Sequence, residues 1–372
     1  MRTFGVGIIG CGNISTAYLT FAPLFKRLEI RAVADIVADA AEARAAEFGV
    51  AARSIDELLG SDDIDIVINL TIPEAHYRVT RNILEAGKHA YTEKPLVLDL
   101  DDGKALAELA AAKDLRIGAA PDTFLGGAHQ QARALIDAGG LGQITSGTAH
   151  IMSHGAEGWH PNPDFFYLPG GGPMLDMGPY YITNLVQLLG PVARVTALTS
   201  QATDTRTIGS EPRRGEVIPV ETPTNIHALL QFASGATVTL TTSWDVWAHR
   251  HSNMELYGTE GALIVPDPNI FNGTVEQAGR EGGFAPVAPW DHPLGRPNQE
   301  DRANYRTAGL ADMARAIDEG GPHRCSFELA LHVTDVMTSI LRAGEAQSFV
   351  EMTTTCARPA ALGPEAAQSL LA

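Results

Sequence analysis

Three groups of residues in this sequence have types and a spacing that could do chemistry. A glycine turn, Gly10-Cys11-Gly12-Asn13-Ile14-Ser15, stands between an apolar run and a helical pattern. A lysine follows a second apolar run in Glu93-Lys94-Pro95, and Asp176 and Tyr180 lie four residues apart after three consecutive glycines. Such groups could bind a pyrophosphate, hold a proton acceptor and contact a polar substrate.

The glycine turn is typical of a dinucleotide-binding site. Gly10 would permit the tight turn, Gly12 would let the backbone approach a pyrophosphate, and the next helix would offer its free N–H groups. Asn13 and Ile14 belong to this turn, and we expect both to contact the cofactor. Ser15 stands where the third glycine of such turns usually is, and it is small enough for close packing of helix on strand.

An acidic residue, Asp35, ends the next expected strand. A carboxylate there can accept hydrogen bonds from the ribose hydroxyls and repels a 2′-phosphate. No arginine follows it directly, so the sequence favours NAD over NADP. The alternative is that Asp35 only caps the following turn.

The pattern around these residues predicts two domains. Residues 1–121 alternate apolar strands with amphipathic helices, which indicates an α/β domain with a doubly wound parallel Rossmann sheet. In residues 122–372 strands follow one another, which predicts an α+β domain for substrate binding and oligomerisation with a large, mostly antiparallel open sheet. Its closing helices could pack back on the first domain.

The expected boundaries can be stated for each element. In the first domain the strands are 4–9, 30–34, 64–70, 89–92 and 116–119, and the helices are 13–28, 38–48, 73–86 and 100–113. In the second the strands are 144–153, 194–200, 225–232, 236–244, 253–257 and 262–265, and the helices are 125–138, 178–189, 305–319 and 328–343. Residues 206–223 and 279–297 are expected to form long surface loops.

Composition excludes several classes of protein. Of 372 residues, 27 are basic and 44 acidic, and a net charge of −17 argues against nucleic-acid or membrane binding. The strand that opens the chain leaves no room for a signal peptide before it, so we expect a cytoplasmic protein. Cys11, Cys325 and Cys356 show no zinc or disulfide spacing and are interpreted as structural thiols. The pairs His150/His154 and His249/His251 lack an obvious third ligand, and no metal is expected.

The motifs together resemble the glucose–fructose oxidoreductase / inositol dehydrogenase / rhizopine-catabolism (Gfo/Idh/MocA) family over almost the whole chain. The resemblance rests on the glycine turn, on Glu93-Lys94-Pro95 after a strand, and on Gly170-Gly171-Gly172-Pro173-Met174-Leu175-Asp176-Met177-Gly178-Pro179-Tyr180. It implies an NAD-dependent oxidoreductase that acts on a ring hydroxyl of a sugar, glycoside or cyclic polyol. Further cofactor contacts are then expected from a set of residues after the strands: Thr71, Pro73, His76, Glu93 and Lys94.

The chemistry needs a proton acceptor beside the substrate oxygen. The resemblance implies that Lys94 and Asp176 serve there; the alternatives are an exposed lysine and a plain helix N-cap. Inositol dehydrogenase-like members carry histidine at the position of Tyr180, whereas the glucose–fructose oxidoreductase branch has tyrosine. A phenol is a poor base unless a cation lies close, so whether Tyr180 or Lys94 takes the proton stays open, as does a packing role for Tyr180.

Further residues could contact a sugar, namely Asp122, Thr123, Trp159 and His160, because polar groups beside an aromatic surface suit such a ligand. His160 could also be a loop residue, and His76 a packing residue. Three other activities stay open: an NAD-retaining glycosidase acting by transient oxidation and elimination, an aldose–aldose oxidoreductase with tightly bound cofactor, and a sugar or NAD sensor. We expect a homodimer or homotetramer through the second domain's sheet.

Overall fold

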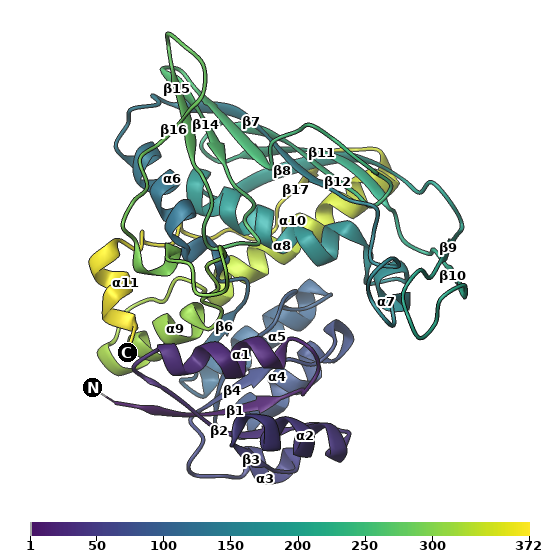
Figure 1. Cartoon of the computed structure of the whole chain (residues 1–372), viewed down its shortest axis with the longest axis vertical. Helices are drawn as coiled ribbons and strands as arrows, with labels where there is room; N and C mark the ends of the chain where they lie inside the picture. The colour runs from purple at the N-terminus through teal and green to yellow at the C-terminus, as the bar shows by residue number, and fades with distance from the viewer. Residues whose placement is uncertain (1) are drawn as a thin grey trace. The chain divides into compact units, whose positions relative to one another are not determined.

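The computed structural model describes residues 2–372 and divides the chain into two compact units. Unit 1 contains the residues through Gly127 together with Asp291–Leu331 and Pro359–Ala372. Unit 2 contains Ala128–Trp290 and His332–Arg358. The colour ramp of Figure 1 shows that late segments, in green and yellow, join the purple N-terminal part in unit 1.

Unit 1 is built on a parallel sheet of six strands. The strand order is β3-β2-β1-β4-β5-β6, and every neighbouring pair is parallel. This order is that of a doubly wound Rossmann sheet, as the sequence predicts. The strands are β1 Phe4–Ile9, β2 Leu28–Ala34, β3 Ala51–Ala52, β4 Ile66–Asn69, β5 His89–Thr92 and β6 Ile117–Ala119.

Helices connect these strands and cover the sheet. They are α1 Ser15–Phe21, α2 Ala38–Phe48, α3 Ile55–Leu59, α4 His76–Glu85, α5 Leu100–Ala112, α9 Ala308–Glu319 and α11 Pro364–Leu370, with 3₁₀ turns at Ala22–Leu24, Pro73–Ala75, Thr123–Leu125 and Pro293–Gly295. The expected helix 13–28 is too long, because α1 gives way to a 3₁₀ turn that holds Pro23 and β2 already begins at Leu28. Helix α3 was not expected; Ser54 and Glu57 form a capping box at its start.

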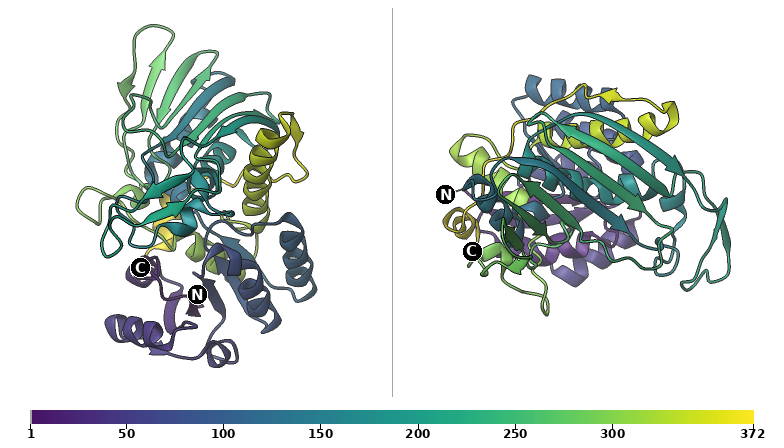
Figure 2. Two further views of the ribbon diagram at one scale, coloured as in Figure 1. Left: turned by 90° about the vertical axis from the view of Figure 1, so that its right-hand side faces the viewer. Right: turned by 90° about the horizontal axis from the view of Figure 1, so that it is seen from above.

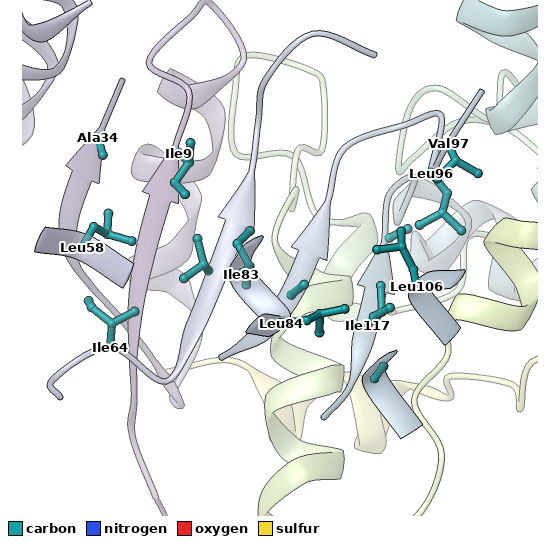
Figure 3. Packing of buried hydrophobic residues seen from close by; sticks show 14 of the residues in the cluster. Ile9, Ala34, Leu58, Ile64, Ile83, Leu84, Leu96, Val97, Leu106 and Ile117 are labelled. Atoms are coloured by element: carbon teal, nitrogen blue, oxygen red, sulfur yellow. The ribbon is translucent and has the colours of Figure 1, made fainter. Parts of the chain in front are cut away.

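An apolar core fills one side of this sheet (Figure 3). Figure 3 shows Ile9 and Ala34 on the strands, and Leu58, Ile83 and Leu106 on the helices packed against them. The partly buried Phe327, Ala330 and Leu331, from the start of helix α10 (Phe327–Ala346), also pack against this cluster. Residues far apart in sequence therefore complete the core of unit 1.

Unit 2 contains a nine-stranded sheet in the order β16-β15-β14-β13-β7-β12-β11-β8-β17. All neighbouring pairs are antiparallel except β7 and β12, so the prediction of a mostly antiparallel sheet is confirmed. Its strands are β7 Ile144–Met152, β8 Val192–Ser200, β11 Asn225–Phe232, β12 Thr237–Ser243, β13 Met254–Gly258, β14 Gly261–Val265, β15 Glu276–Gly279, β16 Ala285–Pro286 and β17 Val350–Glu351. The turn between β11 and β12 uses Gly235, whose φ is +93°.

Helices lie on one face of this sheet. Helix α8 (Gly172–Leu189) contacts β7, β11 and β12, and the unit also contains α6 (Gly127–Asp137), α7 (Asp164–Tyr167) and most of α10. In the right-hand view of Figure 2 the strands lie in front of the helices, so this near face has no helix over it among the described residues. Leu198 and Leu229 are exposed in β8 and β11, whereas Ala197 and Ala228, their sequence neighbours, are buried.

Two expectations for unit 2 are wrong. Residues 206–223 are not simply a loop, because β9 (Thr205–Thr207) and β10 (Val217–Pro219) pair there as an antiparallel ribbon. Helix α8 begins at Gly172 rather than at residue 178, so Asp176 lies inside the helix and is not its N-cap. Among the described residues, no helix is long and apolar enough to cross a membrane.

Candidate active site

The predicted cofactor residues of unit 1 follow the strands of the parallel sheet. Gly10 follows β1, Asp35 follows β2, Thr71 comes after β4, and Glu93 and Lys94 follow β5. Since these strands are all parallel, the residues lie at one edge of the sheet, the carboxyl edge. Ligands of open α/β sheets bind at this edge.

The glycine turn has the conformation that its sequence requires. Gly10 has a φ of +107°, and a Cβ there would lie 2.6 Å from the carbonyl oxygen of Leu70. At Gly12 an added Cβ would have no atom of the described residues within 4 Å, so the missing side chain leaves room for a bound group. Ser15 is buried and its hydroxyl donates to the Gly12 carbonyl at 2.6 Å, which stiffens the turn.

A cavity of about 480 Å³ opens beside this turn. Its lining includes the predicted Gly10, Gly12, Asp35 and Thr71. The other lining residues were not predicted: Ile9, Ile36, Ile55, Leu59, Leu70, Ile72, Ala75, Arg78, Val79 and Asn82. The last four have the 3- and 4-residue spacing of one helix face, a signal that the sequence contains.

Asp35 binds two backbone amides in the structure. Its Oδ2 accepts from the N–H of Cys11 at 2.7 Å, and its Oδ1 accepts from the N–H of Val37 at 2.9 Å. The carboxylate therefore ties β2 to the glycine turn while it lines the cavity. Its role toward the ribose stays a prediction.

A buried polar cluster joins two of the cofactor loops. The Nδ1 of His76 lies 2.7 Å from the carbonyl oxygen of Pro95, and its Nε2 lies 3.0 Å from that of Thr71. His76 is fully buried, which lowers its imidazole pKa. Asn69, which was not predicted, accepts from both the amide and the hydroxyl of Thr71. His76 therefore bridges the loop that contains Thr71 and the loop that contains Pro95. Its direct contact with the cofactor stays a prediction.

The glutamate before the lysine is held from two sides. The Tyr18 hydroxyl donates to Glu93 Oε1 at 2.8 Å, and the backbone N–H of Lys94 donates to Glu93 Oε2 at 2.9 Å. Burial first, and then the charge of Glu93, raise the pKa of Tyr18 well above its ordinary value. Tyr18 therefore stays a hydrogen-bond donor and fixes the loop on which the half-buried Lys94 lies.

Asp122 and Thr123 follow β6, and both are buried. The Asp122 Oδ2 accepts from the N–H groups of Thr307 and Gly309 at 2.9 and 3.0 Å, at the start of α9. Burial raises the pKa of Asp122 to about 6, although these two donors and the charge of Arg306 oppose that change. The contacts of this carboxylate thus give it a capping role and lend no support to the expected substrate contact.

In unit 2, Asp176 and Tyr180 lie one turn apart in α8, and both are half-buried. Asp176 lines a pocket of about 250 Å³ at the end of β7. Trp159 lines the same pocket, as predicted for a substrate residue. The sequence analysis expected none of the other lining residues to contact the substrate: His150, Ile151, Met152, Ser153, Gly155, Ala156, Met177, Tyr181, Trp244, His249, Asn253 and Asp267.

Three of the lining residues form a hydrogen-bonded polar group. Asn253 Nδ2 donates to the Tyr181 hydroxyl at 2.9 Å, and that hydroxyl donates to Asp267 Oδ1 at 3.4 Å. Burial, followed by the charge of Asp267, raises the pKa of Tyr181, so the phenol stays protonated. No sequence motif indicated these residues, because they come from α8, from the residue before β13 and from a loop.

The histidine pairs that were considered as metal ligands have other surroundings. The rings of His150 and His251 stack at 4.1 Å, and His154 stacks on Trp247 at 3.3 Å. Burial, with the charges of His251 and His249, lowers the pKa of His150. Within residues 2–372, no group of three or more His, Cys, Asp or Glu side chains is placed to hold a metal ion.

His160 does not line the pocket, among the residues that the structure describes. Its Nδ1 accepts from the N–H of Asn162 at 3.1 Å, and its ring packs edge-on against Phe165 and Phe166. The alternative of a loop residue therefore describes its contacts, and its substrate role stays a prediction.

The edge of unit 1 fits an adenine dinucleotide. Ile36 and Ile72, both strongly exposed, offer apolar surface beside the cavity, and the carboxylate of Asp35 lines the same cavity. Gly12 leaves room for a pyrophosphate. Lys94, at the end of β5, belongs to the same edge.

Comparison with known families gives two matches along the chain. Residues 4–120 match the model described as "Oxidoreductase family, NAD-binding Rossmann fold", and residues 129–264 match that of the GFO/IDH/MocA C-terminal domain.

Two relatives with named activities are similar over most of the chain, and a third is similar over a shorter part. A dTDP-3,4-didehydro-2,6-dideoxy-alpha-D-glucose 3-reductase of Streptomyces violaceoruber is 28% identical, covering 86% of this chain and 88% of the relative. A levoglucosan dehydrogenase of Pseudarthrobacter phenanthrenivorans is 26% identical, covering 95% and 99%. An uncharacterized oxidoreductase of Schizosaccharomyces pombe is 30% identical, but the match covers only 39% of that protein.

Solved structures share the fold. A levoglucosan dehydrogenase in complex with NADH and L-sorbose superposes with a TM-score of 0.79, covering 95% of this chain and all of the other, at 22% identity. At this identity the similarity concerns the fold alone.

Proposed function

Because the chain belongs to the Gfo/Idh/MocA family of NAD-binding oxidoreductases, we propose that it transfers a hydride between a ring hydroxyl carbon of a sugar, glycoside or cyclic polyol and the nicotinamide of NAD. The observation that carries the proposal is the pocket of unit 2. It combines the carboxylates of Asp176 and Asp267 and the amide of Asn253 with the indole rings of Trp159 and Trp244. Hydroxyl groups and an apolar ring face are what such a lining recognises.

NAD supplies the hydride acceptor, and the chain's own residues must bind the substrate and move one proton. Lys94 would place its ammonium beside the substrate oxygen and favour loss of the hydroxyl proton. Asp176 would accept a hydrogen bond from a neighbouring hydroxyl and orient the ring. Tyr180 would either take the proton, with its phenol made more acidic by a nearby cation, or hold the substrate while Lys94 takes it.

Glu93 would serve this reaction through position. It holds the backbone amide of Lys94 and is itself held by Tyr18. These hydrogen bonds would restrain the loop and fix the position of Lys94. Proton transfer is sensitive to small displacements of the groups that exchange the proton, so a fixed position would favour it.

The proposal is tested with a panel of sugars, glycosides and cyclitols offered with NAD and, in parallel, with NADP. Reduced-cofactor absorbance with at least one compound is expected, faster with NAD, and Lys94→Ala should abolish most of it. Products released from glycosides without added NAD would indicate the glycosidase activity instead. No absorbance change and no product with any compound would refute hydride transfer to these substrates.

A further inference from the structure

The pocket of unit 2 has an unusual aromatic rim. Trp159 lines the pocket and yet 66% of its side chain is exposed. Phe165, in the short helix α7, is 46% exposed. Large apolar side chains are mostly buried in folded proteins, and those that gather exposed beside a cavity mark a binding surface.

This rim is fixed to the wall of the pocket. The Trp159 ring lies 6.3 Å from the ring of Phe166, and Phe166 lies 5.8 Å from Trp244, which lines the pocket from within. The amide of Trp159 donates to the Ala156 carbonyl at 3.2 Å, so the backbone turns sharply beneath the indole. The exposed ring is therefore held in place before any ligand arrives.

Neighbouring segments anchor the same loop. The amide of Gly209 donates to the Glu157 carbonyl at 2.8 Å, and the Ser210 hydroxyl donates to the His160 carbonyl at 2.5 Å. Arg206, which is buried, pairs with Glu157 at 3.1 Å and also with Asp245. A buried guanidinium shared between two carboxylates makes this a rigid support.

The size of the pocket limits what it can enclose. Its volume of about 250 Å³ lies below the roughly 300–1,000 Å³ of sites that enclose drug-sized ligands. One sugar ring can lie inside, among the polar groups of Asp176, Asn253 and Asp267. A second ring joined to it would have to lie outside, at the mouth.

We propose that the exposed face of Trp159 stacks against a second ring of the substrate, so that the preferred substrates are glycosides or disaccharides rather than free monosaccharides or inositols. The inference rests on the proposed function and narrows its substrate class. Inside the pocket, polar side chains bind the hydroxyls of the ring that is oxidised. At the rim, the indole face meets the apolar face of a sugar or an aromatic aglycone, a contact that contributes without hydrogen bonds.

The test measures binding and turnover separately. The probes are phenyl α- and β-glycosides of glucose, galactose, mannose and xylose, each compared with its free sugar. Affinities are measured by titration calorimetry on the full-length protein saturated with NADH, so that no oxidation occurs. At least one phenyl glycoside should bind more tightly than its parent sugar by about 2- to 12-fold, the range for one aromatic stacking contact.

Three variants identify the residue responsible. Trp159→Ala should reduce the ratio of glycoside to free-sugar affinity to near one, and Trp159→Phe should keep part of it because a phenyl ring still stacks. Trp290→Ala, which removes a part-exposed tryptophan of the same unit that is not among the pocket's lining residues, should leave the ratio unchanged.

Each other outcome overturns the inference. Equal affinities for glycosides and free sugars, or a ratio that Trp159→Ala leaves intact, would show that the rim binds no second ring. A lower mass of Trp159→Ala in light scattering, without a change in the ratio, would assign the tryptophan to a subunit contact. Turnover of free sugars with no preference for glycosides would overturn this inference and leave the proposed function standing, whereas absence of turnover with every compound would refute the proposed function itself.

Discussion

The raised pKa of the buried Asp122 carboxyl group can be tested with a single substitution. Replacing it by asparagine removes a buried carboxyl group whose pKa is about 6, against an ordinary value of 3.8. The amide keeps one oxygen that can accept from the N–H groups of Thr307 and Gly309, as the Asp122 carboxylate does. The substitution therefore changes the charge more than the shape.

The direction of the effect follows from the raised pKa of Asp122. The folded protein binds the proton of Asp122 more tightly than the unfolded chain does. Protonation of Asp122 therefore raises the free energy of unfolding fully below about pH 3.8, and this gain is lost as the pH rises through 6. At pH 8 the ionised carboxylate destabilises the fold, relative to acid pH, by about 3 kcal/mol, because each pKa unit corresponds to about 1.4 kcal/mol. Asp122→Asn has no such dependence.

The assay is urea unfolding of wild type and Asp122→Asn between pH 4.5 and 8, followed by circular dichroism. Over this pH range the stability of the variant minus that of the wild type should increase with pH by about 2 kcal/mol, with most of the increase between pH 5 and 7, because the rest of the effect lies below pH 4.5. Asp62→Asn, which removes an exposed carboxyl group, is the control for general charge effects. A difference that stays flat, or that decreases with pH, would refute the assignment of a raised pKa to Asp122.

Three further results are expected. Asp35→Ser should narrow the preference for NAD over NADP by at least about tenfold, since it removes a negative charge from beside the 2′-phosphate; equal affinities of the wild type in fluorescence titrations would contradict this. Lys94→Ala should lower kcat by about 10²–10⁴-fold while the affinity for NAD changes about tenfold or less. If Tyr180 takes the proton, Tyr180→Phe should lower kcat nearly as much, and the double variant should be little worse than either single variant. Nearly full activity of Lys94→Ala would refute the proposed mechanism. Light scattering should give a mass well above 39.5 kDa, because the sheet of unit 2 has a face without helices over it; a clean monomer would contradict pairing through that face.

The sequence predicted most reliably where local rules decide the structure. Strand β1 and helix α2 have the expected boundaries, because a continuous apolar run and an alanine-rich amphipathic stretch each leave one choice. Gly10 was correctly placed in a turn, since its positive φ and the nearness of Leu70 exclude a side chain there. The parallel arrangement of the strands followed from the same alternation of strand and helix, whereas the order of the strands was not predicted.

Other features depend on distant partners and could not be predicted. Asp122 follows a strand at the ligand-binding edge, yet its carboxylate binds Thr307 and Gly309, which only the tertiary fold brings to it. Asn253, just before β13, and Asp267, in a loop, line the pocket of unit 2 from segments that carry no motif. Single residues in irregular segments give no periodic signal, so such contacts need the structure.

Unit 1 is assembled from three separate segments of the chain, and this affects how the chain folds. The core around β6 needs Phe327, Ala330 and Leu331, the edge of β6 bridges to Ser326, and Phe25 pairs with Leu371 near the other end of the chain. During synthesis the Rossmann strands are made first, and these partners are made only near the end of the chain. We therefore expect the nascent domain to expose part of its apolar surface until synthesis is nearly complete. A fragment cut after Gly127 would keep the whole glycine turn and the cofactor loops and still lack part of its core. We expect such a fragment to be aggregation-prone, and we expect the two units to become stable only in the completed chain.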